Sequence, residues 1–205
     1  MKTIFQIANQ LTGDIWKPEY GNTISDIENA EKRLGIKLPQ TLKEFYLAAG
    51  NLPQITSSFE YFDKLSELSI EDNKLLFLTE NQGTCRWAID LDTNKIWMRT
   101  REWQEDDTDI DTFIRAIMYY NCAEAGYPYG ACLEPHLFPE LKQTLDKSWE
   151  EVSNYDGLYI YALKDNLIWF FGKDGMPGPS NSIFLSCRRR DNFTQLCSSL
   201  GFVAI

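Results

Sequence analysis

The densest group of chemically active side chains in this sequence is a run of six carboxylates within ten residues, with no basic residue among them. These acids are Glu102, Glu105, Asp106, Asp107, Asp109 and Asp111. Acids at the start of a helix stabilise it by a few tenths to ~1 kcal/mol, and one or two are enough for that. Because six exceed that need, the run is either a solvated face or a patch that binds a basic partner.

Calcium binding is the first chemistry to test on this run. Asp107, Asp109 and Asp111 have the alternate spacing that opens an EF-hand loop. That loop also needs a glycine at its sixth position and a bidentate glutamate at its twelfth, and these positions hold Thr112 and Met118. The sequence therefore disfavours calcium, and we predict no metal site.

Catalytic motifs give little support for an enzyme. His136 is the only histidine, and no predicted nucleophile or catalytic carboxylate adjoins it in the sequence. The chain has no G-x-S-x-G, H-E-x-x-H or P-loop motif, and its five cysteines include no C-x-x-C pair. We expect no catalytic residues and no cofactor, and we expect reduced, mostly buried thiols.

Two tryptophans accompany the acidic run. Trp103 lies inside it, and Trp97 lies on a predicted strand, on the face opposite Ile96 and Met98. Aromatic side chains within a charged rim are typical of protein-binding hot spots. The alternative is that C-terminal elements simply cover both rings. The candidate partner-binding residues are Trp97, Glu102, Trp103, Glu105, Asp106, Asp107, Asp109 and Asp111.

Composition limits the kinds of partner. The chain has 20 lysines and arginines against 30 aspartates and glutamates, a net charge of −10. Such a surface repels nucleic acid and anionic membranes and attracts basic partners. With 43% hydrophobic and 14% aromatic residues, the chain is typical of folded globular proteins. The sequence shows neither a secretory signal nor a membrane span, so we expect a cytoplasmic protein.

Several elements must position these residues. Residues 24–34 and 39–50 predict two helices, the first with a capping box at Ser25 and Glu28 and a stop at Gly35. Residues 84–91 and 95–100 predict a hairpin, and the helix after it should begin near Thr108 or Asp109. In the second half we predict a helix from Pro139 that includes Trp149 and Val152, a hairpin over 158–172, a strand over 183–187 and a last helix from Asp191.

The two-helix segment over residues 24–50 resembles the N-terminal motif of the SUKH superfamily, which comprises bacterial toxin-immunity proteins and related yeast regulators of cell-wall assembly. The resemblance covers roughly residues 20–120. It rests mainly on residues of the two predicted helices and of the turn between them. They are Ile27, Ala30, Glu31, Leu34, Gly35, Leu38, Pro39, Leu42, Phe45 and Tyr46. The segment 75–92, with Trp87, resembles the family's central strand pair, and Phe113, Ile114 and Ile117 resemble its following helix.

The resemblance implies an α+β fold with a mainly antiparallel sheet flanked by helices, which acts by binding. We expect residues 1–205 to form one SUKH-like domain, with a family-like core over 1–125 and residues 126–205 packed on the same sheet; separate domains are the alternative. The predicted function is immunity: occlusion of a cognate basic toxin, for which a nuclease is a natural target. The alternative is a regulatory scaffold without a toxin. Monomer and weak dimer both stay open.

Overall fold

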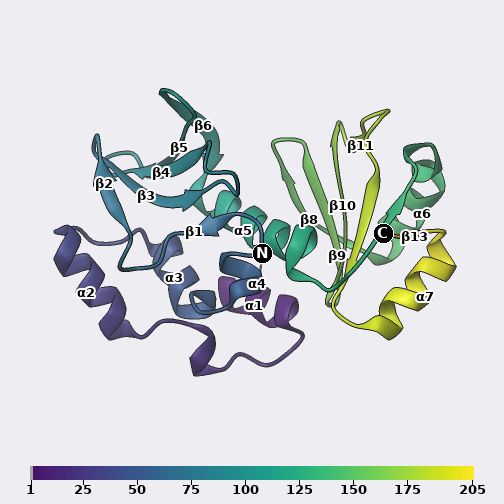
Figure 1. The fold of residues 1–205 in the computed structure, drawn as a ribbon, viewed down its shortest axis with the longest axis horizontal. Helices are drawn as coiled ribbons and strands as arrows, with labels where there is room; N and C mark the ends of the chain where they lie inside the picture. The colour runs from purple at the N-terminus through teal and green to yellow at the C-terminus, as the bar shows by residue number, and fades with distance from the viewer. Residues whose placement is uncertain (1) are drawn as a thin grey trace.

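The structure is a computed structural model that describes residues 2–205. It contains two antiparallel β-sheets, which lie on either side of the helix α5 (Ile110–Asn121), as Figure 1 shows. Helices and antiparallel sheets together confirm the predicted α+β class. Within residues 2–205, no helix combines the length and apolar character needed to cross a membrane.

The N-terminal helices are α1 (Ile4–Thr12), α2 (Ile24–Leu34), α3 (Gln40–Ala49) and α4 (Pro53–Thr56), with a 3₁₀ turn at Pro18–Tyr20. The capping box of α2 is formed by Thr23 and Asp26, so the predicted pair Ser25 and Glu28 is wrong by two residues. The shift makes Ile24 the first residue of α2, where it is 62% exposed. Gly35 ends α2 as predicted, with a φ of +72° that favours glycine.

The first sheet has six strands in the order β1-β3-β4-β5-β6, with β2 paired to β3. The predicted hairpin is confirmed as β4 and β5, with Ile89 opposite Ile96. The acidic run, expected to lead straight into a helix, instead forms the edge strand β6. The strands are β1 (Tyr61–Phe62), β2 (Ser69–Glu71), β3 (Lys74–Thr79), β4 (Arg86–Asp90), β5 (Lys95–Arg99) and β6 (Trp103–Asp109).

The second sheet has seven strands in the order β13-β7-β12-β10-β9-β8, with β11 paired to β10. The predicted hairpin over 158–172 is confirmed as β9 and β10, and the predicted last helix as α7 (Arg190–Leu200). The strands are β7 (Tyr129–Leu133), β8 (Glu150–Tyr155), β9 (Leu158–Leu163), β10 (Asn166–Lys173), β11 (Met176–Pro177), β12 (Ile183–Cys187) and β13 (Val203–Ala204).

Short helical segments complete this half. A π-helical turn at Cys122–Gly126 follows α5, and a 3₁₀ turn at Pro135–Leu137 precedes α6 (Phe138–Ser148). The predicted extension of α6 through Trp149 and Val152 is wrong, because the chain turns extended at Trp149 and then pairs with β9 as strand β8. Sheet pairing supplies the backbone hydrogen bonds that a longer helix would otherwise have supplied.

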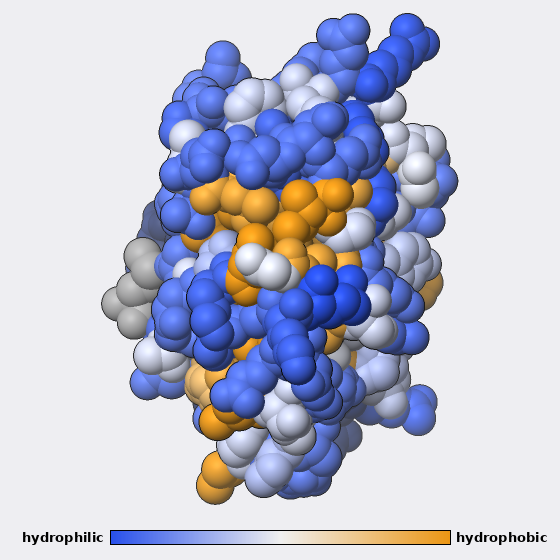
Figure 2. Space-filling view, turned by 90° about the vertical axis from the view of Figure 1, so that its left-hand side faces the viewer, coloured by the Kyte–Doolittle hydropathy of each residue, from blue (hydrophilic) through white to orange (hydrophobic). Residues whose placement is uncertain are grey.

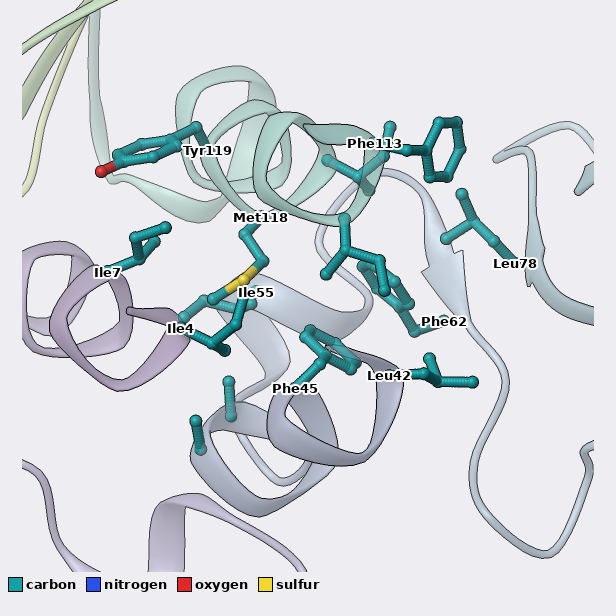
Figure 3. Packing of buried hydrophobic residues seen from close by; sticks show 14 of the residues in the cluster. Ile4, Ile7, Leu42, Phe45, Ile55, Phe62, Leu78, Phe113, Met118 and Tyr119 are labelled. Atoms are coloured by element: carbon teal, nitrogen blue, oxygen red, sulfur yellow. The ribbon is translucent and has the colours of Figure 1, made fainter. Parts of the chain in front are cut away.

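Residues 126–205 were expected to pack on the same sheet as the family-like core, but their strands form the second sheet instead. One face of that sheet nevertheless joins the first core: Leu158, Ile160 and Trp169 belong to the same buried cluster as α1, α3 and α5. Figure 3 shows how Phe113, Met118 and Tyr119 of α5 project among side chains of that cluster. A second cluster lies between the other face of this sheet, α6 and α7. The single-domain organisation stays a prediction, which coincident unfolding transitions of the two sheets would test.

Candidate partner-binding surfaces

The acidic run lies on the free edge of the first sheet. Residues that face one another across antiparallel strands point to the same side, so the pairing of Trp97 with Glu105 and of Arg99 with Trp103 places these four on one face. Trp87 is on the other face, against Phe113 of α5, with ring centroids 6.0 Å apart. We call the side that carries Trp97, Arg99, Trp103 and Glu105 the outer face.

Basic residues of the same sheet cover the outer-face tryptophans. Lys74 Nζ is 4.4 Å from the centroid of the Trp97 ring, and the guanidinium carbon of Arg99 is 4.5 Å from that of Trp103. Cations over indole rings at these distances are attracted by the ring quadrupole. Both indole Nε1 atoms are buried without an acceptor among residues 2–205. The cover over the two rings therefore includes β3 and β5 of their own sheet, which the alternative of C-terminal cover did not anticipate.

The outer face also pairs its charges internally. Arg99 donates to both carboxylate oxygens of Glu71, one of them at 3.0 Å, and Lys95 forms an ion pair with Glu105. The hydrogen bond from Arg99 holds the pKa of Glu71 below its usual value. Glu105 thus already has a cation from its own chain.

Three of the predicted acids, Asp106, Asp109 and Asp111, make contacts within the fold itself. Asp106 accepts hydrogen bonds from the Tyr155 hydroxyl (2.6 Å) and the Thr108 amide (2.8 Å), and it so links β6 to β8. Asp109 caps α5 by accepting from the amides of Asp111 and Thr112. Burial opposes ionisation of Asp109, but these hydrogen bonds outweigh it and lower its pKa.

Asp111 forms an ion pair with Arg115 one turn further along α5. Only Glu102 and Asp107, of the six acids in the run, have no hydrogen bond or ion pair to a side chain within residues 2–205. Both are exposed. The structure therefore places the eight predicted residues on and beside strand β6 but leaves two of the acids unpaired.

A groove of about 410 Å³ lies between the two sheets, beside α5. We call it the inter-sheet groove. Its walls include Trp87 of β4, Tyr120 of α5, Tyr155 of β8 and Phe171 of β10. Sequence analysis missed this site because its lining comes from positions between 60 and 171 that only the packing of the two sheets brings together.

Glu60 is the most buried carboxylate of the groove, only 7% exposed. Its Oε2 accepts from the Asn81 amide at 3.1 Å, the one hydrogen bond to this carboxylate within residues 2–205. Burial, with the charge of Glu80 as a smaller cause, raises the pKa of Glu60 to about 7. A carboxylate that ionises with such difficulty gains more from a cation than an exposed one does.

A larger hollow of about 620 Å³ lies between α2, α3 and the connection from β1 to β2. None of the eight candidate partner-binding residues lines it. Its walls carry both acids and bases: Asp26 and Asp63 with Arg33 and Lys64. Figure 2 shows the side of the molecule that carries α2 and β2, where apolar side chains form a band between hydrophilic ones. Ile70 of β2 is 38% exposed. This side is remote in the sheet order from the β6 edge.

The positions of the cysteines and of His136 bear on metal and thiol chemistry. Within residues 2–205, no three or more His, Cys, Asp or Glu side chains are grouped so that they could hold a metal ion. All five cysteines are free, and three of them are buried. His136 is exposed, in the 3₁₀ turn before α6 on the second-sheet side of the molecule.

Comparison with known protein families gives a match over part of this chain. Residues 21–115 match the SMI1 / KNR4 family (SUKH-1), close to the span of the resemblance. The match confirms the resemblance of these residues, somewhat less than half of the chain, to the SUKH superfamily. The matched span includes the first sheet and the start of α5, whereas the second sheet lies outside it. No curated protein and no solved structure shows a significant match.

Proposed function

We propose that this protein is a cytoplasmic immunity-type binding protein that neutralises a cognate basic toxin by occluding it. The observation that carries the proposal is the acidic free edge of the first sheet, where Glu102 and Asp107 form no ion pair with any of residues 2–205. Such an edge speeds encounter with a basic protein, and buried aromatic contacts then slow dissociation. A nuclease is a natural target, because carboxylates can occupy the channel that binds phosphates.

The protein acts by binding, without catalysis, in this proposal. The net charge of −10 supports a protein partner over nucleic acid or membrane. Its only histidine is exposed beside α6 and does not line the inter-sheet groove. Histidine therefore cannot act as a general acid or base in that groove.

The second candidate function is a regulatory scaffold that binds host proteins, and the large C-terminal half outside the family match favours it. The two functions differ in the number and charge of the partners. A toxin should be a single basic protein encoded beside this gene, whereas a scaffold should bind several unrelated proteins.

A pull-down with the tagged protein from its native cytosol, at low and high salt and followed by mass spectrometry, tests the proposal. We expect one basic protein that is lost at high salt, and co-expression of this chain should abolish that protein's toxicity. Several unrelated partners would support the scaffold instead. A partner whose toxicity persists on co-expression would reject the immunity role.

A further inference from the structure

The inter-sheet groove is one-sided in charge. Twelve residues line it, and four of them are carboxylates: Glu60, Asp106, Asp107 and Asp156. None of the twelve is lysine, arginine or histidine. Carboxylates gathered in a partly enclosed site repel one another and favour a cation from outside.

Aromatic rings form much of the remaining wall. Tyr120 and Phe171 are in edge-to-face contact, with centroids 6.0 Å apart, and Phe171 is 41% exposed at the rim. Tyr155 packs edge-on against Phe113 with centroids 5.3 Å apart, and its hydroxyl bond to Asp106 fixes its position. Fixed aromatic rings beside carboxylates suit a cation on an apolar stem, through both cation–π attraction and burial of the stem.

The groove also holds unused hydrogen-bonding capacity. Within residues 2–205, Glu60 uses one carboxylate oxygen and Asp107 uses none. The buried Nε1–H of Trp87 has no acceptor within residues 2–205, and as a donor it can pair with a backbone carbonyl of a bound segment but not with a guanidinium. A guanidinium can donate to two carboxylate oxygens at once while its plane stacks on a ring, which a lysine ammonium cannot do.

We propose that the inter-sheet groove binds a basic side chain, arginine above all, of a protein partner. The stem packs on Phe171 and Leu158, and the guanidinium lies among the aromatic rings beside Glu60 and Asp107. This inference rests on the proposed function, since it assigns the place where the basic partner is held. It places the contact that slows dissociation of the partner between the two sheets, and not at the tryptophans of the outer face.

Three short peptides test the groove without any toxin: acetyl-Leu-Arg-Leu-amide, the same peptide with neutral citrulline, and the same peptide with glutamate. The readout is the indole N–H resonance of Trp87 in the ¹⁵N-labelled full chain, assigned with a Trp87→Phe variant. We expect saturable shifts of this resonance with the arginine peptide, and binding about tenfold weaker or more with citrulline, the loss of roughly one charge-assisted hydrogen bond.

Substitutions locate the contact. Glu60→Gln should weaken the arginine peptide about tenfold, whereas Glu28→Gln, an exposed acid on α2, should leave it unchanged. If Glu60→Gln does not fold, Asp107→Asn serves in its place, with a smaller expected loss. Equal binding of the arginine and citrulline peptides, or shifts at Trp97 and Trp103 in place of Trp87, would overturn the proposal.

Failure of this inference and failure of the immunity role give different results. Arginine-peptide binding in a chain that gives no protection against the toxin keeps the groove and rejects immunity. Protection by wild-type chain without peptide binding at Trp87 keeps immunity and rejects the groove.

Discussion

The outer face and the inter-sheet groove lie on opposite sides of strands β4, β5 and β6. Both surfaces combine tryptophan with acidic residues. On the outer face, Lys74 and Arg99 lie over Trp97 and Trp103, and Lys95 pairs with Glu105. In the groove, four carboxylates lie among aromatic rings, and none of the twelve described lining residues is basic. The first surface supplies its own cations, and the second does not.

The difference follows from strand alternation. Glu105 faces Lys95 on the outer face and the neighbouring Asp106 faces Tyr155 in the groove, so one acidic segment contributes to two surfaces with different neighbours. Charge density along the sequence therefore gives no measure of the charge that a partner meets. Acids that are already paired add little to binding, whereas unpaired acids in a partly desolvated site attract a cation strongly.

The largest expected difference between the two surfaces is in packing. Trp87→Ala should lower the free energy of unfolding by about 3 kcal/mol, since Trp87 packs against Phe113 and the core. Trp103→Ala should cost about 1 kcal/mol, mainly its contact with Arg99. Urea unfolding measures both, and equal costs would contradict the assignment of Trp87 to the side that holds the core.

The hydrogen bond between Tyr155 and Asp106 ties the two walls of the groove together. Tyr155→Phe removes only the hydroxyl and should cost about 1–2 kcal/mol, because the acceptor is a carboxylate. Tyr159→Phe is the matched control, since no hydrogen bond of its hydroxyl to another group occurs within residues 2–205. A cost for Tyr155→Phe no greater than that of the control in urea unfolding would show that this bond does not link the sheets.

The raised pKa of Glu60 should make the free energy of unfolding depend on pH. Because its folded pKa of about 7 lies above the ordinary glutamate pKa of 4.5, the folded state holds its proton more tightly than the unfolded state does. Wild-type stability should therefore fall as pH rises from 4.5 to about 7 and change no further from this cause above that.

Glu60→Gln removes that titration, and it keeps an oxygen that can accept from the Asn81 amide. We expect the variant to melt about 2–4 °C higher than wild type at pH 8, the shift that ~1 kcal/mol gives in a chain of this size. The difference should shrink towards pH 5. Thermal melts across this range measure it, with Glu102→Gln as the exposed control, and a difference that does not vary with pH would refute the raised pKa.

The smallest expected effect is on the outer face. Lys95→Ala removes the ion pair with Glu105, in which the lysine side chain is 54% exposed. Exposed pairs contribute about 0.2–1 kcal/mol, so the cost should be near 0.5 kcal/mol and should decline in high salt. A cost above 2 kcal/mol in urea unfolding would mean that outer-face pairing stabilises the sheet more than an exposed pair can.

Local patterns were enough to predict several elements from the sequence. The glycine stop at Gly35, the β4–β5 hairpin, and the start of α5 at Asp109 are each encoded within a few neighbouring residues, and the structure confirms them. Strand β6 was not predicted, since its acids have low strand propensity and only pairing with β5 holds them extended.

The candidate site was predictable only in part, for the same reason. Proximity of the eight acidic and aromatic residues follows from their closeness in sequence. Their division into paired and unpaired groups depends on Lys74, Arg115 and Tyr155, which lie at other places in the chain. The groove itself needs the second sheet, and no local pattern gives the position of one sheet against another.

Photocrosslinking of the basic partner isolated by the salt-dependent pull-down would test most directly whether the groove holds it. Phe171 at the groove rim and Lys95 on the outer face would each be replaced, in separate variants, with p-benzoylphenylalanine. The account predicts that irradiation crosslinks the partner from position 171, through a peptide that contains arginine or lysine, and not from position 95. Crosslinks from position 95 with none from position 171 would contradict it and place the partner on the outer face.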